Sequence, residues 1–91
     1  MKEIQPYDIV HDPKLEEELE KLKKKAHTIY ERIIKQILKI SKNPYFGKPL
    51  KFPMAGIRRV HVGPFVLTYE INEKERRITF LKFEHHDDAY K

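Results

Sequence analysis

With 91 residues, 40% hydrophobic and 36% charged, the chain suits one small folded domain, expected over residues 1–91, and is too apolar to be disordered throughout. The absence of cysteine excludes disulfides and thiolate metal sites. The net charge is +5, and residues 42–83 hold nine Lys and Arg against three Glu, so we expect a polyanion to bind this half of the chain.

No segment of the sequence predicts export or membrane insertion. The first residues lack the apolar core of a signal peptide, and no apolar run approaches the roughly 18 residues that span a bilayer. We therefore expect a cytoplasmic protein that has no contact with a membrane.

The first half of the chain predicts a short strand followed by two helices. Residues 3–10 hold the apolar side chains of a strand, Asp12 suits a helix N-cap, and Pro13 suits the first helical position. A break is expected near residues 25–28, and Asn43 with the proline after it ends the helical region. Apolar residues recur at helical spacing in two stretches: Leu15, Leu19, Leu22 and Ala26, then Ile29, Ile33, Ile34, Ile37 and Ile40. Of these, Ile33 and Ile37 are predicted core positions.

A loop and three strands follow. Residues 44–56 are rich in proline and glycine and predict a loop, with Tyr45, Phe46 and Phe52 as aromatic anchors. Strands are predicted at residues 57–62, 65–71 and 76–83. The turns between them are short, which favours an antiparallel meander. The expected fold is α+β: an N-terminal strand, then a two-helix hairpin packed on an antiparallel sheet that ends in the three-strand meander.

A run of lysines ends the first predicted helix, at Lys21 and residues 23–25. Such a run could bind RNA. However, glutamates begin the same helix, and this order of charges complements the helix dipole. Glu17 and Lys21 are also spaced for an i,i+4 pair, as are Glu20 and Lys24. We therefore interpret this run as a solvated helix face.

A second group of cations lies in the loop and strands. Scission of RNA without a metal needs a base for the 2′-hydroxyl proton, an acid for the leaving 5′-oxygen and cations for the crowded phosphorane. Arg59 and His61 share one strand face about 7 Å apart and could supply a cation and a base or acid. They could equally be ordinary exposed residues of a half-solvated sheet. The candidate phosphate-binding residues are Lys48, Lys51, Arg58, Arg59, Arg76 and Arg77.

The C-terminal tail places His85 and His86 before Asp87 and Asp88. Adjacent residues on an extended chain point in opposite directions, so this run is a poor chelate and predicts no metal site. One of the histidines could act singly, and Tyr90 could offer a ring or pack the C-terminus onto the sheet. No glycine-rich phosphate loop is present, and we expect no cofactor.

The order of elements, together with three segments, resembles the RelE/ParE toxins along nearly the whole chain. These segments are KNPYFGKPLKF, GIRRVHVGPFVLTYEI and FEHHDDAY. The last two look most like the YafQ-type branch of RelE-like toxins. In that branch G-Y-R-x-x-H-x-x-P precedes an apolar strand, and a histidine lies four residues before a terminal aromatic.

The resemblance implies the toxin of a type II toxin–antitoxin system, a ribosome-dependent mRNA endonuclease (an mRNA interferase) that inhibits translation. It would need no metal and would use attack of a 2′-hydroxyl on the adjacent phosphate. Residue by residue, it implies that His86 is a general acid or base, that His61 is its partner, and that Tyr90 stacks on or positions a base. The implied partners are the ribosome, mRNA and an acidic antitoxin encoded beside the toxin, bound through a helix or strand.

The sequence also departs from the family pattern. Lys48 stands where the branch has a histidine, Val66 where the wider RelE group has an arginine, and His86 where that group often has an arginine. His85 and Asp87 have no assigned counterpart. The alternative function is therefore a non-catalytic toxin-fold protein that binds an antitoxin, rRNA or, like ParE, DNA gyrase. A generic RNA-binding domain ranks last, because the aromatic RNP strand and the GXXG loop are missing.

Overall fold

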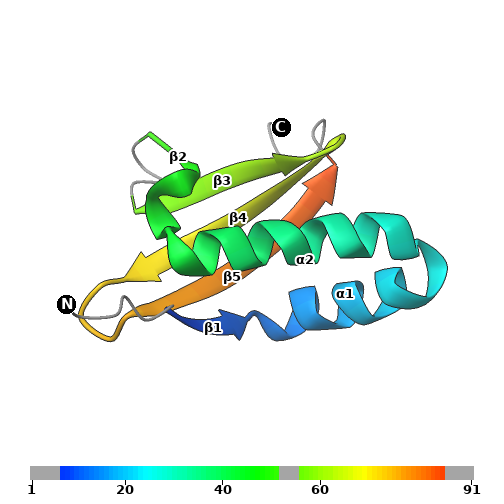
Figure 1. Cartoon of the computed structure of the whole chain (residues 1–91), viewed down its shortest axis with the longest axis horizontal. Coiled ribbons are helices and arrows are strands. Elements are labelled where there is room, and N and C mark those ends of the chain that lie inside the picture. The colour runs from blue at the N-terminus through cyan, green and yellow to red at the C-terminus, as the bar shows by residue number, and fades with distance from the viewer. Residues whose placement is uncertain (1–6, 52–55, 86–91) are drawn as a thin grey trace.

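The computed structural model describes residues 7–51 and 56–85. Two helices pack on a five-stranded sheet of order β1-β5-β4-β3-β2 (Figure 1). This arrangement confirms the predicted α+β class. In chain order the elements are β1 (Asp8–His11), α1 (Pro13–Lys25), α2 (His27–Lys42), the 3-10 helix η1 (Pro44–Phe46), β2 (Lys48–Pro49), β3 (Ile57–Val62), β4 (Phe65–Asn72) and β5 (Arg77–His85).

The helix hairpin forms as the sequence predicts. The carboxylate of Asp12 accepts a hydrogen bond from the backbone N–H of Lys14 at 3.0 Å, and Pro13 opens α1. Ala26 separates the two helices, and α2 begins at His27. In the described part of the chain, neither helix is long and apolar enough to cross a membrane.

The surface of α1 differs from the prediction in one respect. Its lysines gather in the last turn, which complements the helix dipole as expected. However, neither Glu17–Lys21 nor Glu20–Lys24 forms a salt bridge in the described residues. Holding two long exposed side chains together costs entropy that water-screened attraction barely offsets, so correct spacing alone does not form these pairs.

The sheet is mixed rather than antiparallel throughout. Strands β3, β4 and β5 form the predicted antiparallel meander. β1, however, pairs with β5 in parallel, from Asp8 opposite Arg77 to His11 opposite Phe80. The short turns that define the meander carry no information on how a strand far away in sequence pairs with it. The rest of the strand predicted over residues 3–10, up to residue 6, lies outside the described residues.

The segment predicted as a loop contains two short elements, η1 and β2. Lys48 pairs with Arg59 across β2 and β3, which adds a fifth strand. The prediction of aromatic anchors is wrong for Tyr45 and Phe46, whose side chains are 52% and 48% exposed. Phe52 lies outside the described residues.

The anchor of this segment is Tyr69 on β4, a fully buried side chain. Its hydroxyl donates a hydrogen bond to the carbonyl of Pro44 at 2.7 Å and accepts one from the N–H of Gly47 at 2.9 Å. Gly47 is required by this close approach, because a Cβ there would lie 2.5 Å from the Tyr69 hydroxyl and 2.8 Å from the carbonyl of Arg59. The backbone around Phe46 is therefore fixed against β3 and β4.

The hydrophobic core lies between the helices and one sheet face. Ile33 and Ile37 of α2 are 0% and 3% exposed, which confirms their predicted burial. They pack in one cluster with Leu15, Leu19, Ile40, Val60, Val62, Leu67, Tyr69, Ile78, Phe80 and Phe83. Val66 is also buried but lies outside this cluster.

Candidate functional site

Strand β3 presents Arg59 and His61 together. They alternate with Val60 and Val62, which are buried in the core, so both belong to the other sheet face. An Nη1 atom of Arg59 lies 2.9 Å from Nε2 of His61. Lys48 of β2 lies directly opposite Arg59 in the register. The predicted sharing of a strand face is therefore confirmed, and one more cation lies beside the pair.

Helix α2 lies beside the end of β3 that extends past its pairing with β2, next to His61. The side-chain amide of Gln36 donates to the carbonyl of His61 at 3.5 Å. At the β3–β4 turn, a Cβ placed on Gly63 would lie 3.2 Å from the guanidinium of Arg32. A hollow of about 220 Å³ lies between the two elements. It is lined by Arg32, Lys35, Gln36, Lys39, His61 and Val62.

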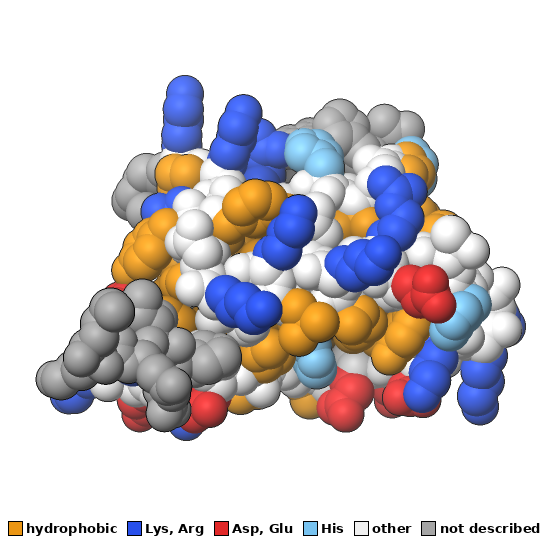
Figure 2. Space-filling model, in the orientation of Figure 1, with side chains coloured by type: hydrophobic (Ala, Val, Ile, Leu, Met, Phe, Trp, Pro, Cys, Tyr) orange, Lys and Arg blue, Asp and Glu red, His pale blue; other side chains and the backbone are white. Residues whose placement is uncertain are grey.

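The cations of α2 were absent from the predicted site. Arg32, Lys35, Lys39 and Lys42 lie within about 80° of one another around the helix, at 3.6 residues per turn. None of them forms a salt bridge within the described residues. Figure 2 shows Lys and Arg side chains spread over the face that carries α2, while acidic side chains lie mostly along its lower and right margins. The spacing of these cations is a signal that sequence analysis could have used.

A second hollow, of about 200 Å³, adjoins the first. It is lined by Gln36, Phe46, Gly47, Lys48, Arg59, Val60 and His61. Gln36 and His61 line both hollows, so His61 lies where the two meet. This edge of the sheet thus combines an imidazole, several cations and one exposed aromatic ring.

Three predicted phosphate-binding arginines are engaged elsewhere. Arg58 donates to the carbonyl of Gly47 at 2.6 Å, and its guanidinium lies 4.9 Å from the ring centroid of Tyr45. Arg76 lies 4.2 Å over the ring of Tyr7, and Arg77 forms a 2.5 Å salt bridge with Glu75. RNA binding by these three residues stays a prediction.

Arg77 is also distant from the Arg59–His61 pair. It pairs with Asn72 of β4, whereas His61 pairs with Val66 of the same strand. Six residues of strand separate those partners, or about 20 Å. Lys51 is exposed just beyond β2, and its role stays a prediction too.

The β4–β5 turn holds a separate network around Glu73. The hydroxyl of Tyr7 donates to the Glu73 carboxylate at 2.7 Å, and this hydrogen bond lowers the pKa of Glu73 and raises the pKa of Tyr7. A hydrogen bond to Glu73 raises the pKa of Tyr45 as well. The hydrogen bonds of Glu73 therefore connect the start of β1 and η1 to the β4–β5 turn, away from His61.

Tyr69 lies outside this network, and burial raises the pKa of its hydroxyl.

The tail residues are only partly described. His85 ends β5 opposite Phe65, and its ring meets the Phe65 ring edge-on at 5.6 Å between centroids. Phe65 packs against the core, so His85 belongs to the helix-side face and His61 to the other. His86, Asp87 and Tyr90 lie outside the described residues. Among the residues described, no group of three His, Asp or Glu is placed to hold a metal.

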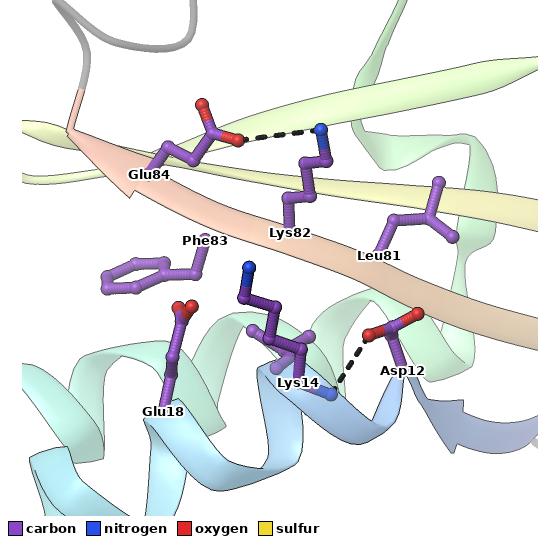
Figure 3. Close-up of a pocket in the computed structure, with 8 residues that line it drawn as sticks. Asp12, Lys14, Glu18, Leu81, Lys82, Phe83 and Glu84 are labelled. Atoms are coloured by element: carbon purple, nitrogen blue, oxygen red, sulfur yellow. Dashed lines mark hydrogen bonds and ion pairs between the residues drawn. The ribbon is translucent and has the colours of Figure 1, made fainter.

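A larger hollow, of about 350 Å³, lies between α1 and β5, on the far side of β4 from His61. Glu18 points from α1 toward Phe83 of β5 (Figure 3), and Lys82 pairs with Glu84 at 3.8 Å. Three acids and two lysines are among the lining residues, so its charge does not favour a polyanion. The lining residues are Asp12, Lys14, Leu15, Glu18, Leu81, Lys82, Phe83 and Glu84.

Known proteins resemble this chain both in sequence and in structure. Residues 9–90 match the family model described as ParE toxin of type II toxin-antitoxin system. A candidate toxin of Methanocaldococcus jannaschii named RelE4 is 35% identical over 86 residues, which cover 93% of this chain and 92% of the relative.

Two solved structures share the fold. The toxin–antitoxin complex RelBE2 of Mycobacterium tuberculosis aligns with a TM-score of 0.75 at 24% identity, over 88% of this chain and 98% of the other. The YoeB/ParE toxin of Agrobacterium tumefaciens aligns with a TM-score of 0.79 at 19% identity, over 87% and 98%. At these identities the two structures support the fold alone.

The family follows from the two sequence matches. The family model covers almost all the described residues. The sequence of the Methanocaldococcus jannaschii relative is 35% identical over 93% of this chain, which is too high an identity for unrelated proteins. The resemblance seen in the sequence segments is therefore confirmed at the level of the superfamily, while the YafQ-type branch stays a prediction. The chain belongs to the RelE/ParE superfamily of toxins from type II toxin–antitoxin systems.

Proposed function

We propose that this toxin inhibits translation by cutting mRNA on the ribosome, with no metal ion. The observation that carries the proposal is the 2.9 Å contact between the Arg59 guanidinium and the His61 imidazole, with Lys48 opposite Arg59. A titratable ring beside two cations on one face of the sheet suits chemistry at a phosphodiester.

The proposed reaction is a transesterification. A base removes the proton of the 2′-hydroxyl, and the 2′-oxygen forms a bond to the adjacent phosphorus. The bond from phosphorus to the 5′-oxygen breaks, and an acid protonates that leaving oxygen. The products are a 2′,3′-cyclic phosphate and a 5′-hydroxyl, so no water or metal enters the balance. Arg59 and Lys48 would stabilise the negative charge that gathers on the phosphorane.

The Arg59–His61 contact couples phosphate binding at Arg59 to the availability of the His61 imidazole as a base. While Nε2 of His61 accepts from Arg59, its lone pair is engaged. A phosphate is a stronger acceptor for a guanidinium than a neutral imidazole is, because it carries charge. Binding of the substrate phosphate to Arg59 would therefore free Nε2 to take the 2′-hydroxyl proton.

The tail supplies the remaining groups of the proposal. His86 is the second acid or base and Tyr90 the base-stacking ring, both assigned from the family resemblance. In support, β5 ends at His85 beside Phe65, the residue before Val66, which is the strand partner of His61. The chain therefore leaves the sheet at the same end as His61.

The test is a cell-free translation reaction in which primer extension maps mRNA 5′ ends. The wild-type toxin should produce discrete cuts in codon register on translated mRNA and few on free RNA. His61→Ala and His86→Ala should each slow cutting about 10²- to 10⁴-fold, the usual contribution of one acid or base. Circular dichroism checks that each variant is folded. Arrested translation with intact mRNA would contradict the proposal.

We also infer a protein partner, an acidic antitoxin encoded beside the toxin. The related RelBE2 structure is a toxin–antitoxin complex, and the cationic surface over α2 and β3 would favour an acidic chain. Co-expression with the neighbouring gene should yield a stable complex and restore growth. A toxin that the neighbouring gene product neither binds nor neutralises would count against this partner.

The second candidate is a toxin that arrests growth without cutting RNA. Val66 favours it: the side chain is 2% exposed and lies between His61 and Glu84 in the register, where the wider RelE group has an arginine. An apolar side chain there supplies no charge to a phosphorane. Inhibition of DNA supercoiling by purified gyrase, with mRNA intact, would support this candidate.

A further inference from the structure

Phe46 is a large aromatic residue that the fold leaves exposed. Its side chain is 48% exposed, although it lies in a segment pinned by buried contacts. Exposed aromatic rings beside cations are the usual means by which proteins hold single-stranded nucleic acid, because every base has a face on which to stack.

The position of Phe46 is fixed by its neighbours in the chain. Pro44 is buried, and its carbonyl accepts from the Tyr69 hydroxyl, which in turn accepts from the N–H of Gly47. Both hydrogen bonds flank Phe46 in the sequence. The backbone therefore presents the ring in one place, so little conformational freedom is lost when a ligand packs on it.

The hollow beside Phe46 is lined by side chains that suit one nucleotide. Lys48, Arg59 and His61 line it together with the ring. Its volume of about 200 Å³ falls below the roughly 300–1,000 Å³ of pockets for drug-sized ligands and suits one planar base. A phosphate on Arg59 would place the attached nucleotide within reach of the ring.

Two more side chains leave room for a base. The ammonium group of Lys39 lies 5.7 Å from the ring centroid of Phe46 and lines the other hollow, whereas the ring itself lines this one. Oε1 of Gln36 is buried and has no hydrogen-bond partner among the described residues. A turn of the Gln36 side chain would bring this oxygen to the hollow that the residue lines, where an exocyclic amine of a bound base could donate to it.

We propose that Phe46 is the stacking surface of a nucleobase subsite, which binds a base next to the phosphate held by Arg59 and Lys48. This inference rests on the proposed RNA-directed function and deepens it. The ligand class is a single-stranded RNA base with its own phosphate. A side chain of a bound protein partner would be a different occupant and is an outcome of the test.

The experiment measures the affinity of the full chain for short RNA by NMR titration. One oligonucleotide is a trinucleotide whose central ribose is 2′-deoxy, so that the 3′ phosphate cannot be cut. Two matched oligonucleotides lack the base on one or the other side of that phosphate. Phe46→Ala should weaken binding of the complete trinucleotide about 5- to 150-fold, the worth of one stacked base, and leave one abasic oligonucleotide unaffected.

The neighbouring Tyr45 supplies the matched control. It is equally exposed but lines a different hollow, beside Glu73. Tyr45→Ala should therefore leave the affinity for all three oligonucleotides unchanged, and Phe46→Trp should restore stacking. Equal weakening of all three oligonucleotides by Phe46→Ala would indicate a structural role and overturn the proposal. No effect on RNA, with weaker antitoxin binding, would assign the hollow to a protein side chain instead.

The outcomes also separate this inference from the nuclease. If millimolar trinucleotide leaves the Phe46 ring signals unshifted while mRNA is still cut on ribosomes, the stacking subsite is wrong and the nuclease stands. If Phe46 distinguishes complete from abasic RNA while no cuts occur, the subsite stands and the nuclease is wrong.

Discussion

The two helices of the hairpin bury similar faces but carry different charge on their surfaces. α1 holds five lysines and four glutamates, whereas α2 holds Arg32, three lysines and the single acid Glu31. The charges of α1 nearly cancel and follow the helix dipole. Glu31 pairs with His27 at 2.8 Å and forms no salt bridge with a cation of α2 within the described residues.

The clustering of cations on α2 costs helix stability. Like charges three or four residues apart destabilise a helix by about 0.2–0.5 kcal/mol per pair. Lys35 and Lys39 are one such pair, and Arg32 and Lys42 add others. We expect the cations of α2 beside His61 to bind an anionic ligand, whereas the lysines of α1 are balanced by the glutamates of the same helix. Charge balance, rather than the number of lysines, is therefore the feature that distinguishes the two helices.

The buried faces of α1 and α2 should contribute similarly to stability, because both pack in the hydrophobic core. Ile33 of α2 is 0% exposed and Leu19 of α1 is 6% exposed. Truncation of either side chain to alanine should cost about 2–5 kcal/mol, the transfer energy plus the cavity left behind. Urea unfolding at 25 °C measures this cost. A loss below about 1 kcal/mol for Ile33→Ala would contradict its burial.

Reversal of charge on the exposed faces should affect translation inhibition through α2 but not through α1. The double variant Lys35→Glu/Lys39→Glu should weaken inhibition of cell-free translation about 10- to 100-fold, because it replaces attraction to phosphates by repulsion. The matched variant Lys21→Glu/Lys24→Glu on α1 should stay within about twofold of wild type. Equal losses in the two variants would show that overall charge matters and that the α2 face does not.

Salt dependence gives a smaller but more specific effect. Two phosphate contacts to a single strand contribute about 1.4 to the slope of log affinity against log salt concentration. Lys35→Gln/Lys39→Gln should lower the slope by about that amount, as measured by RNA binding at several salt concentrations. An unchanged slope would mean that neither lysine meets a phosphate.

The smallest expected effect comes from a residue on neither helix. The hydrogen bond from Tyr7 holds the pKa of Glu73 below its ordinary value of 4.5. The stabilisation is therefore present above pH 4.5 and is lost as the pH falls through the lower folded-state pKa. Glu73→Gln should lower the Tm slightly at pH 7, less than Ile33→Ala does, and the difference should vanish in acid. A difference that grows in acid would contradict the assigned sign.

Sequence patterns predicted the local features and missed those set by distant contacts. The break at Ala26 and the shared face of Arg59 and His61 follow from local periodicity, and both were predicted. The parallel pairing of β1 with β5 depends on partners about 70 residues apart. The placement of Lys39 near His61 depends on the packing of α2 beside β3, which no local pattern predicts. His86 and Tyr90 remain predictions from the resemblance.

We propose that RNA is cut at the Arg59–His61 edge of the sheet. Comparison of Arg59→Ala with Arg77→Ala tests this best. The sequence predicts both arginines to bind phosphate, but their partners on β4, Thr68 and Asn72, lie four residues or about 14 Å apart. Primer extension on ribosome-bound mRNA gives the cutting rate of each. We expect a loss of about 100-fold or more for Arg59→Ala and less than about twofold for Arg77→Ala. Equal rates for the two variants would contradict the account.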